Sequence, residues 1–165
     1  MRLADSLIDE LEREAKSTVR MLERIPADRF DWKPHDKSMS IGQLAWHVAN
    51  LPRVGVRGLK ERKVDIDKAR PPANAGQDLV AALRDSVAEL KVALQATPDE
   101  VLLKERFAFV RGDETVTSFP LAGFIRTVVL NHSVHHRGQL SVYLRLLNIA
   151  VPAMYGRSAD ESAFG

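Results

Sequence analysis

The chain has 165 residues, 45% of them hydrophobic and 28% charged, a composition typical of a globular protein that predicts one domain over residues 1–165. The 24 Lys and Arg residues exceed the 22 Asp and Glu residues by a net charge of +2, so we expect no dedicated nucleic-acid binding. Cysteine is absent, which excludes disulfides, iron–sulfur clusters and a cysteine nucleophile. Neither a secretory signal nor an apolar run of about 18 residues is visible, so we expect a cytoplasmic protein without membrane contact.

Apolar residues at helical spacing predict a first helix from Leu3 to about Ile25, which Pro26 ends. A loop with two prolines follows. The second helix has a sharp start, because Ser40 and Gln43 match a capping box.

The end of the second helix is set by helix-breaking residues. Pro52, or Gly55 and Gly58 beyond it, is expected to end or bend the helix. The basic and then proline-rich segment from Arg53 to Asn74 is interpreted as a connection.

A third helix is predicted from about Gln77 to Ala96, followed by a short extra turn with Thr97 as its N-cap and Pro98 in its first position. The segment from Arg106 to Thr117 is interpreted as irregular or as a small hairpin.

The fourth helix is expected to be the longest, with Ser118 as its cap, Pro120 in its first turn and an end near Leu147. Leu146 is expected on its core side, and Gly138 indicates close packing or a functional approach. Four capped amphipathic helices predict an all-α protein, a four-helix bundle with long connections.

The five histidines are the main candidates for chemistry: His35, His47, His132, His135 and His136. On a wheel of about 100° per residue, His132 and His136 fall on the core-facing stripe, one turn apart, where two imidazoles can hold one ion. His135 lies close to the same stripe, so the wheel also admits His132 with His135.

A third ligand could come from His47, at the border of the buried stripe of the second helix, because helix bundles build metal sites from facing helices. Three neutral imidazoles would bind Zn²⁺, Ni²⁺, Fe²⁺ or Mn²⁺ and leave positions for water or substrate. The competing interpretation is a set of hydrogen-bonded core histidines. No Glu follows a first histidine in the HExxH pattern, so a zincin-type protease is excluded.

Two further residues are weak catalytic candidates. Gln139 points toward the core on the wheel and could support a ligand, or it could be a buried amide bonded to a neighbouring helix. Tyr155 could reach the site as a proton donor, or it could simply pack on the core.

The run from Asn131 to Leu140, NHSVHHRGQL, resembles the signature of the DinB-like superfamily, which includes the YfiT-type proteins. The segment from Ser40 to His47, SIGQLAWH, is similar to the other ligand segment of that superfamily, and the tail from Val151 to Glu161 is also similar. The resemblance covers most of the chain, from the first helix to this tail.

This resemblance implies an up-down-down-up four-helix bundle, often a homodimer, with a three-histidine metal centre. Transferred to this chain, the ligands would be His47, His132 and His136, and His135 would be a neighbour that does not bind the metal.

Related families include thiol-dependent enzymes, namely mycothiol-dependent maleylpyruvate isomerases and bacillithiol transferases. The resemblance therefore implies a metal-dependent enzyme that transfers a low-molecular-weight thiol to an electrophilic small molecule. A hydrolase or isomerase that uses activated water, and a metal-binding or interaction protein without turnover, are the alternatives.

Overall fold

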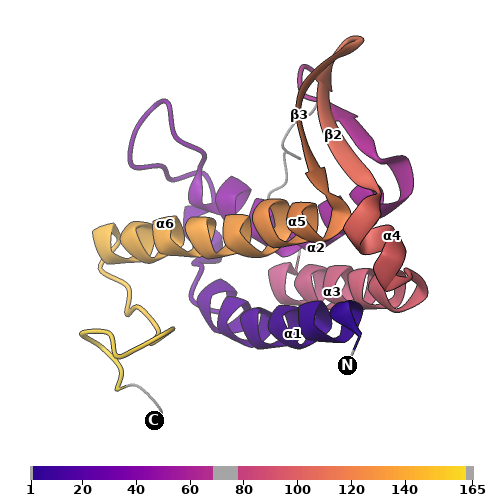
Figure 1. Ribbon diagram of the computed structural model, residues 1–165. Helices are drawn as coiled ribbons and strands as arrows, with labels where there is room; N and C mark the ends of the chain where they lie inside the picture. The colour runs from indigo at the N-terminus through magenta and orange to yellow at the C-terminus, as the bar shows by residue number, and fades with distance from the viewer. Residues whose placement is uncertain (1, 69–77, 163–165) are drawn as a thin grey trace.

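The computed structural model describes residues 2–68 and 78–162. Four long helices form its body (Figure 1), and α3 packs against α1 and α2 while α6 packs against α2 and α1. Their bounds are Leu3–Leu22 for α1, Ile41–Glu61 for α2, Leu79–Ala96 for α3 and His132–Leu146 for α6.

The helices run in two directions. The backbone N–H of Leu3, at the start of α1, donates a 2.8 Å hydrogen bond to Asp99, which follows the end of α3. In Figure 1, α1 and α6 both run away from the end at which α2 and α3 finish. The four long helices thus follow the up-down-down-up order that the resemblance implies.

A three-stranded sheet closes that end, so the expectation of an all-α protein is wrong in this part of the chain. The strands β2 (Arg106–Arg111) and β3 (Glu114–Pro120) form an antiparallel hairpin, and β1 (Lys63–Asp65) pairs in parallel with β2. Phe107 and Phe109 lie two residues apart on β2, so their rings share one face of the sheet. Gly112 takes φ of 56° in the turn, which glycine adopts without steric strain. Parallel pairing with β1 joins segments far apart in sequence, which local patterns do not reveal.

The helix α2 does not end at its proline. It continues to Glu61, so the expected end near Pro52, Gly55 or Gly58 is wrong, as is the expected connection from Arg53. Pro52, Gly55 and Gly58 are all buried, and tight packing around them outweighs the lost backbone hydrogen bond.

Several other boundaries differ from the predictions. The first helix stops at Leu22 rather than near Ile25, and the predicted start of the third helix at Gln77 lies outside the described residues. The extra turn is confirmed as α4 (Asp99–Lys104), but Pro98 is its N-cap and Thr97 instead caps the end of α3.

The fourth predicted helix begins later and is not uniform. Ser118 lies in β3 rather than at a helix cap, and Pro120 is the N-cap of α5 (Leu121–Phe124). A π-helical segment, η2 (Ile125–Asn131), joins α5 to α6. Each π-helical residue turns the chain by less than the roughly 100° of an α-helix, so the core face shifts around the axis before α6 begins.

The shift changes which residues of α6 face the core. Leu146 was expected in the core but is 60% exposed, whereas Arg137 is buried. Gly138 is exposed, and a Cβ built on it would meet nothing within 4 Å, so the expected close approach at this glycine is wrong.

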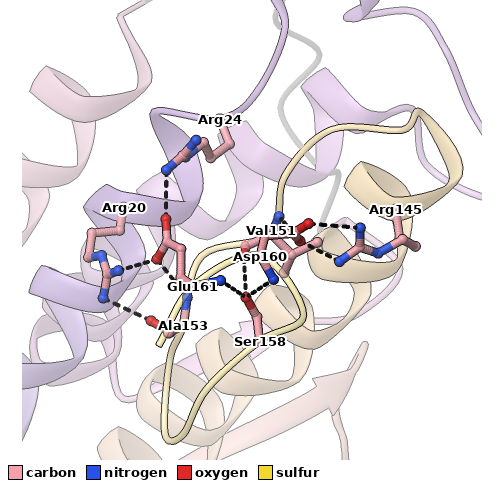
Figure 2. Close-up of polar contacts among 8 residues, drawn as sticks. All are labelled: Arg20, Arg24, Arg145, Val151, Ala153, Ser158, Asp160 and Glu161. Carbon is pink, nitrogen blue, oxygen red and sulfur yellow. Dashed lines mark hydrogen bonds and ion pairs between the residues drawn. The ribbon is translucent and has the colours of Figure 1, made fainter. Parts of the chain in front are cut away.

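The tail after α6 folds back onto the body, as Figure 2 shows. Glu161 accepts hydrogen bonds from Arg20 of α1 and from Arg24, which lies just after α1, and Asp160 pairs with Arg145 of α6. The N–H of Ala153 also donates to Glu161 at 2.9 Å, which holds the tail in a compact loop.

None of the helices in residues 2–68 and 78–162 combines the length and apolarity needed to cross a lipid bilayer.

Candidate metal centre

His47 is placed by a helix whose start is fixed. The predicted capping box is present: the Ser40 hydroxyl accepts from the Gln43 N–H at 3.2 Å, and the Gln43 side chain accepts from the Ser40 N–H at 2.9 Å. Leu44 and Val48, on either side of His47, are fully buried. The start and the apolar face of α2 together determine where the imidazole of His47 lies.

His132 and His136 lie in the first two turns of α6, directly after the π-helical segment η2. Since η2 winds less tightly than an α-helix, it sets the angle at which these two residues leave the axis. They project from adjacent turns of one face, as their spacing of four residues predicted.

The three histidines converge from two helices. Each offers one ring nitrogen, and these atoms all lie within 4.8 Å of one another. The Nε2 atoms of His132 and His136 are 2.7 Å apart. Ring centroids are separated by 4.4 Å between His132 and His136, and by 5.1 Å and 4.8 Å from His47 to each of them.

Burial keeps these imidazoles neutral. It lowers the pKa of His47 from 6.5 to about 4, and the charges of His136 and His132 act in the same direction. Burial also lowers the pKa values of His132 and His136, in the case of His136 against the hydrogen bond to Gln139. Neutral imidazole is the form that has a lone pair for a metal ion.

The donor set suits a divalent cation. Bonds of about 2.0–2.1 Å to imidazole nitrogen place the ligand nitrogens of one ion ~3.0 to 3.4 Å apart. The nitrogens of this group lie within 4.8 Å of one another, and those of His132 and His136 are 2.7 Å apart, so their separations bracket that range. No other set of three or more His, Cys, Asp or Glu residues in the described segments converges in this way. Three protein ligands are the pattern of a site that keeps a position for substrate.

The other two histidines lie outside the group. His135 is exposed, with its ring centroid 5.0 Å from that of His136. His35 is exposed in the loop before α2, where its Nδ1 accepts from the N–H of Lys37. The helical wheel allowed His132 to pair with either His135 or His136. In the structure, His132 lies against His136.

Gln139 contacts the group, although it does not point into the core. Its position on α6 is exposed, because the π-helical segment moved the core face. Its Oε1 nevertheless lies 2.6 Å from Nδ1 of His136. Gln139 is therefore a neighbour of one candidate ligand and not the buried amide that the wheel allowed.

Tyr155 is engaged elsewhere. Its side-chain hydroxyl donates to Glu14 at 2.5 Å and contacts Arg137, while the residue as a whole is 66% exposed. Burial of the hydroxyl and the hydrogen bond to Glu14 raise the pKa of Tyr155 to about 12. In the described part of the chain, the hydrogen bonds of Tyr155 connect the tail to α1 and α6, and none goes to a histidine.

A buried ion pair beside the histidines was not anticipated. The Arg137 side chain is 3% exposed and pairs with the Glu14 carboxylate, while its Nη1 also donates to Thr18 at 3.0 Å. Arg137 directly follows His136, and a wheel of about 100° per residue that ignores η2 turns it away from the stripe that holds His132 and His136. The position of Arg137 in the sequence, directly after the core-facing His136, was the signal that could have indicated a buried ion pair.

Comparison with known proteins gives a consistent result. The DinB family profile matches residues 1–163. An uncharacterized protein, YrdA of Bacillus subtilis (strain 168), is 24% identical over 96% of this chain and 92% of its own length.

Two solved structures share the fold. A DinB-like protein of Bacillus subtilis, YjoA, superposes with a TM-score of 0.69 at 18% identity, covering 93% of this chain and 99% of that one. A DinB-like protein of Bacillus cereus ATCC 10987 gives a TM-score of 0.70 at 22% identity, covering 92% of this chain and 97% of its own. Since the family profile spans nearly the whole sequence, the chain belongs to the DinB family.

Proposed function

We propose that this DinB family protein binds a divalent metal ion through His47, His132 and His136, and that it transfers a low-molecular-weight thiol to an electrophilic substrate. The observation that carries the proposal is the convergence of three ring nitrogens within 4.8 Å. Two packed helices hold them, so the arrangement is part of the fold and not of a loop.

The donor chemistry supports catalytic use. Three imidazole ligands leave coordination positions for substrate, and Zn²⁺, Ni²⁺, Fe²⁺ and Mn²⁺ all accept such a set. A cation bound there would lower the pKa of a thiol ligand from about 8.5, so that thiolate is available near neutral pH.

The chain itself has no cysteine, so the thiol has to arrive as a substrate. Transfer then forms one bond from the thiol sulfur to the electrophilic carbon of the acceptor. The leaving group departs with its bonding electron pair, and the thiol proton passes to solvent.

Metal binding is tested first. We expect metal analysis of the purified protein to give about one divalent ion per chain, and the H47A/H132A/H136A triple variant to contain none. The variants H135A and H35A are matched controls, because each removes an imidazole outside the group. Equal metal content in the wild type and the triple variant would overturn the proposed site.

Activity is tested second, with mycothiol, bacillithiol, glutathione and cysteine supplied in turn with a chromogenic aryl halide. We expect thiol-dependent consumption of the halide that a chelator abolishes and that the triple variant lacks. Chelator-sensitive hydrolysis of test esters or amides without added thiol would instead favour the water-activating alternative. A metal-loaded protein inactive in both screens would favour a binding role without turnover.

A further inference from the structure

The contact between Gln139 and His136 concerns the ring nitrogen that does not face the other histidines. Nε2 of His136 points at Nε2 of His132, 2.7 Å away. Its Nδ1 points the opposite way and lies 2.6 Å from Oε1 of Gln139. The side-chain oxygen of Gln139 therefore contacts Nδ1 of His136, and the protonation of Nδ1 determines whether Nε2 has a lone pair for a metal ion.

A neutral imidazole carries one N–H and one lone pair, and the hydrogen-bond partner of one nitrogen fixes the state of the other. If Nδ1 holds the proton and donates to a carbonyl oxygen, Nε2 keeps its lone pair. If Nδ1 instead accepts from an amide N–H, Nε2 carries the proton and cannot bind a metal. The direction of this one hydrogen bond thus sets the tautomer of a candidate ligand.

We propose that Gln139 is a positioning residue, whose side-chain oxygen accepts from Nδ1–H of His136 and so leaves Nε2 of His136 unprotonated and directed at the three-histidine group. The assignment rests on the proposed metal site for its functional meaning. In the metal-free chain, Nε2 of His136 then accepts from Nε2–H of His132 across the 2.7 Å contact. The tautomer of His136 is thus a property of the metal-free chain and is tested separately.

The geometry of α6 favours this role. Gln139 lies three residues after His136 on the same helix, a spacing at which side chains meet without distorting the backbone. His136 is only 7% exposed, so solvent has little access to its ring, and a nearby side chain is needed to satisfy Nδ1. Carbonyl or carboxylate partners of metal-ligating histidines serve this purpose in metal sites generally.

The first test uses ¹⁵N-labelled, metal-free protein at neutral pH, with long-range ¹H–¹⁵N correlations of the imidazole rings. We expect His136 to be the Nδ1–H tautomer in the wild type and in Q139E, which retains an oxygen acceptor. We expect Q139A to show a mixture with the Nε2–H tautomer. The S141A variant, two residues further along α6, is the control and should match the wild type.

A wild-type His136 in the Nε2–H form, or an unchanged tautomer in Q139A, would overturn the proposal. Gln139 is exposed, so Q139A is expected to fold, and far-ultraviolet circular dichroism checks this.

The second test is a competition titration with Zn²⁺ alone. We expect Q139A to bind zinc about 10- to 100-fold more weakly than the wild type, and Q139E to bind at least as tightly. Equal zinc affinity of Q139A and wild type would overturn the positioning role while leaving the metal site standing. A wild type that binds no zinc but shows the expected tautomers would overturn the metal site and support the assignment of Gln139.

Discussion

Gly58 of α2 and Phe124 of α5 lie so close together that a Cβ built on Gly58 would be 2.2 Å from Cε1 of Phe124. The Phe124 ring is fully buried and stacks on Phe107 of β2, with ring centroids 4.0 Å apart. The glycine therefore allows α2 to approach the junction between the sheet and the last helices. This packing contributes to holding α2, and with it His47, against the segment that leads into α6.

We expect Gly58→Ala to lower the free energy of unfolding by about 1–3 kcal/mol, because the added methyl group overpacks a rigid aromatic stack. Gly138→Ala is the matched control on α6, where a Cβ meets nothing within 4 Å. That change should raise stability by up to about 1 kcal/mol, since alanine favours an exposed helix. Urea denaturation measures both variants, and a destabilisation of equal size in the two would contradict this account of the glycines.

The buried pair of Arg137 and Glu14 gives a second prediction. Glu14→Gln removes the carboxylate partner of a guanidinium whose side chain is 3% exposed. We expect a loss of about 3–5 kcal/mol in the free energy of unfolding, because the remaining buried charge has no counter-ion.

Glu12→Gln is the control for that prediction, two residues earlier on α1. Glu12 pairs with Lys91 near the surface, where both side chains are at least 40% exposed. Solvent screens such a pair, so we expect a much smaller effect from this variant. If the two substitutions lowered the free energy of unfolding equally, burial of Arg137 would not be the cause of the destabilisation by Glu14→Gln.

Local sequence patterns predicted two parts of the site, namely the start of α2 and the helical face that His132 and His136 share. The capping box at Ser40 fixed the start of α2, and the spacing of His132 and His136 placed them on one helical face. The association of His47 with that pair was a hypothesis from bundle geometry, and the structure brings the three rings together.

The features that sequence reasoning missed depend on longer-range or less common geometry. The π-helical turns of η2 shifted the core face, which moved Arg137 inward and Leu146 and Gln139 outward. A small hairpin was one of the two alternatives predicted for Arg106 to Thr117, but β3 extends to Pro120. Ser118 therefore pairs with Ala108 instead of capping a helix.

The tail provides a third prediction. Glu161 receives hydrogen bonds from Arg20 and Arg24, and its loss should release the tail from α1 (Figure 2). Partly exposed ion pairs contribute roughly 0.2–1 kcal/mol each, so we expect Glu161→Gln to accelerate tryptic cleavage after the exposed Arg157 by about 2- to 10-fold. Mass spectrometry follows the cleavage. Glu105→Gln, which breaks a pair with Arg62 near the sheet, is the control, and an equal acceleration there would contradict a local effect.

Acid destabilisation of the metal-free protein is the fourth prediction. Burial lowers the pKa of His47 from 6.5 to about 4, so between these values the unfolded chain binds a proton that the folded chain does not. The free energy of unfolding should therefore fall as the pH is lowered from about 6.5 toward about 4, and His47 should contribute nothing further above 6.5. Urea denaturation with chelator, at several pH values between about 5 and about 7.5, measures the slope. His47→Gln should flatten it and His35→Gln should not, because His35 lies exposed in a loop. If His47→Gln retained the full wild-type slope, the pH dependence would have to come from other groups.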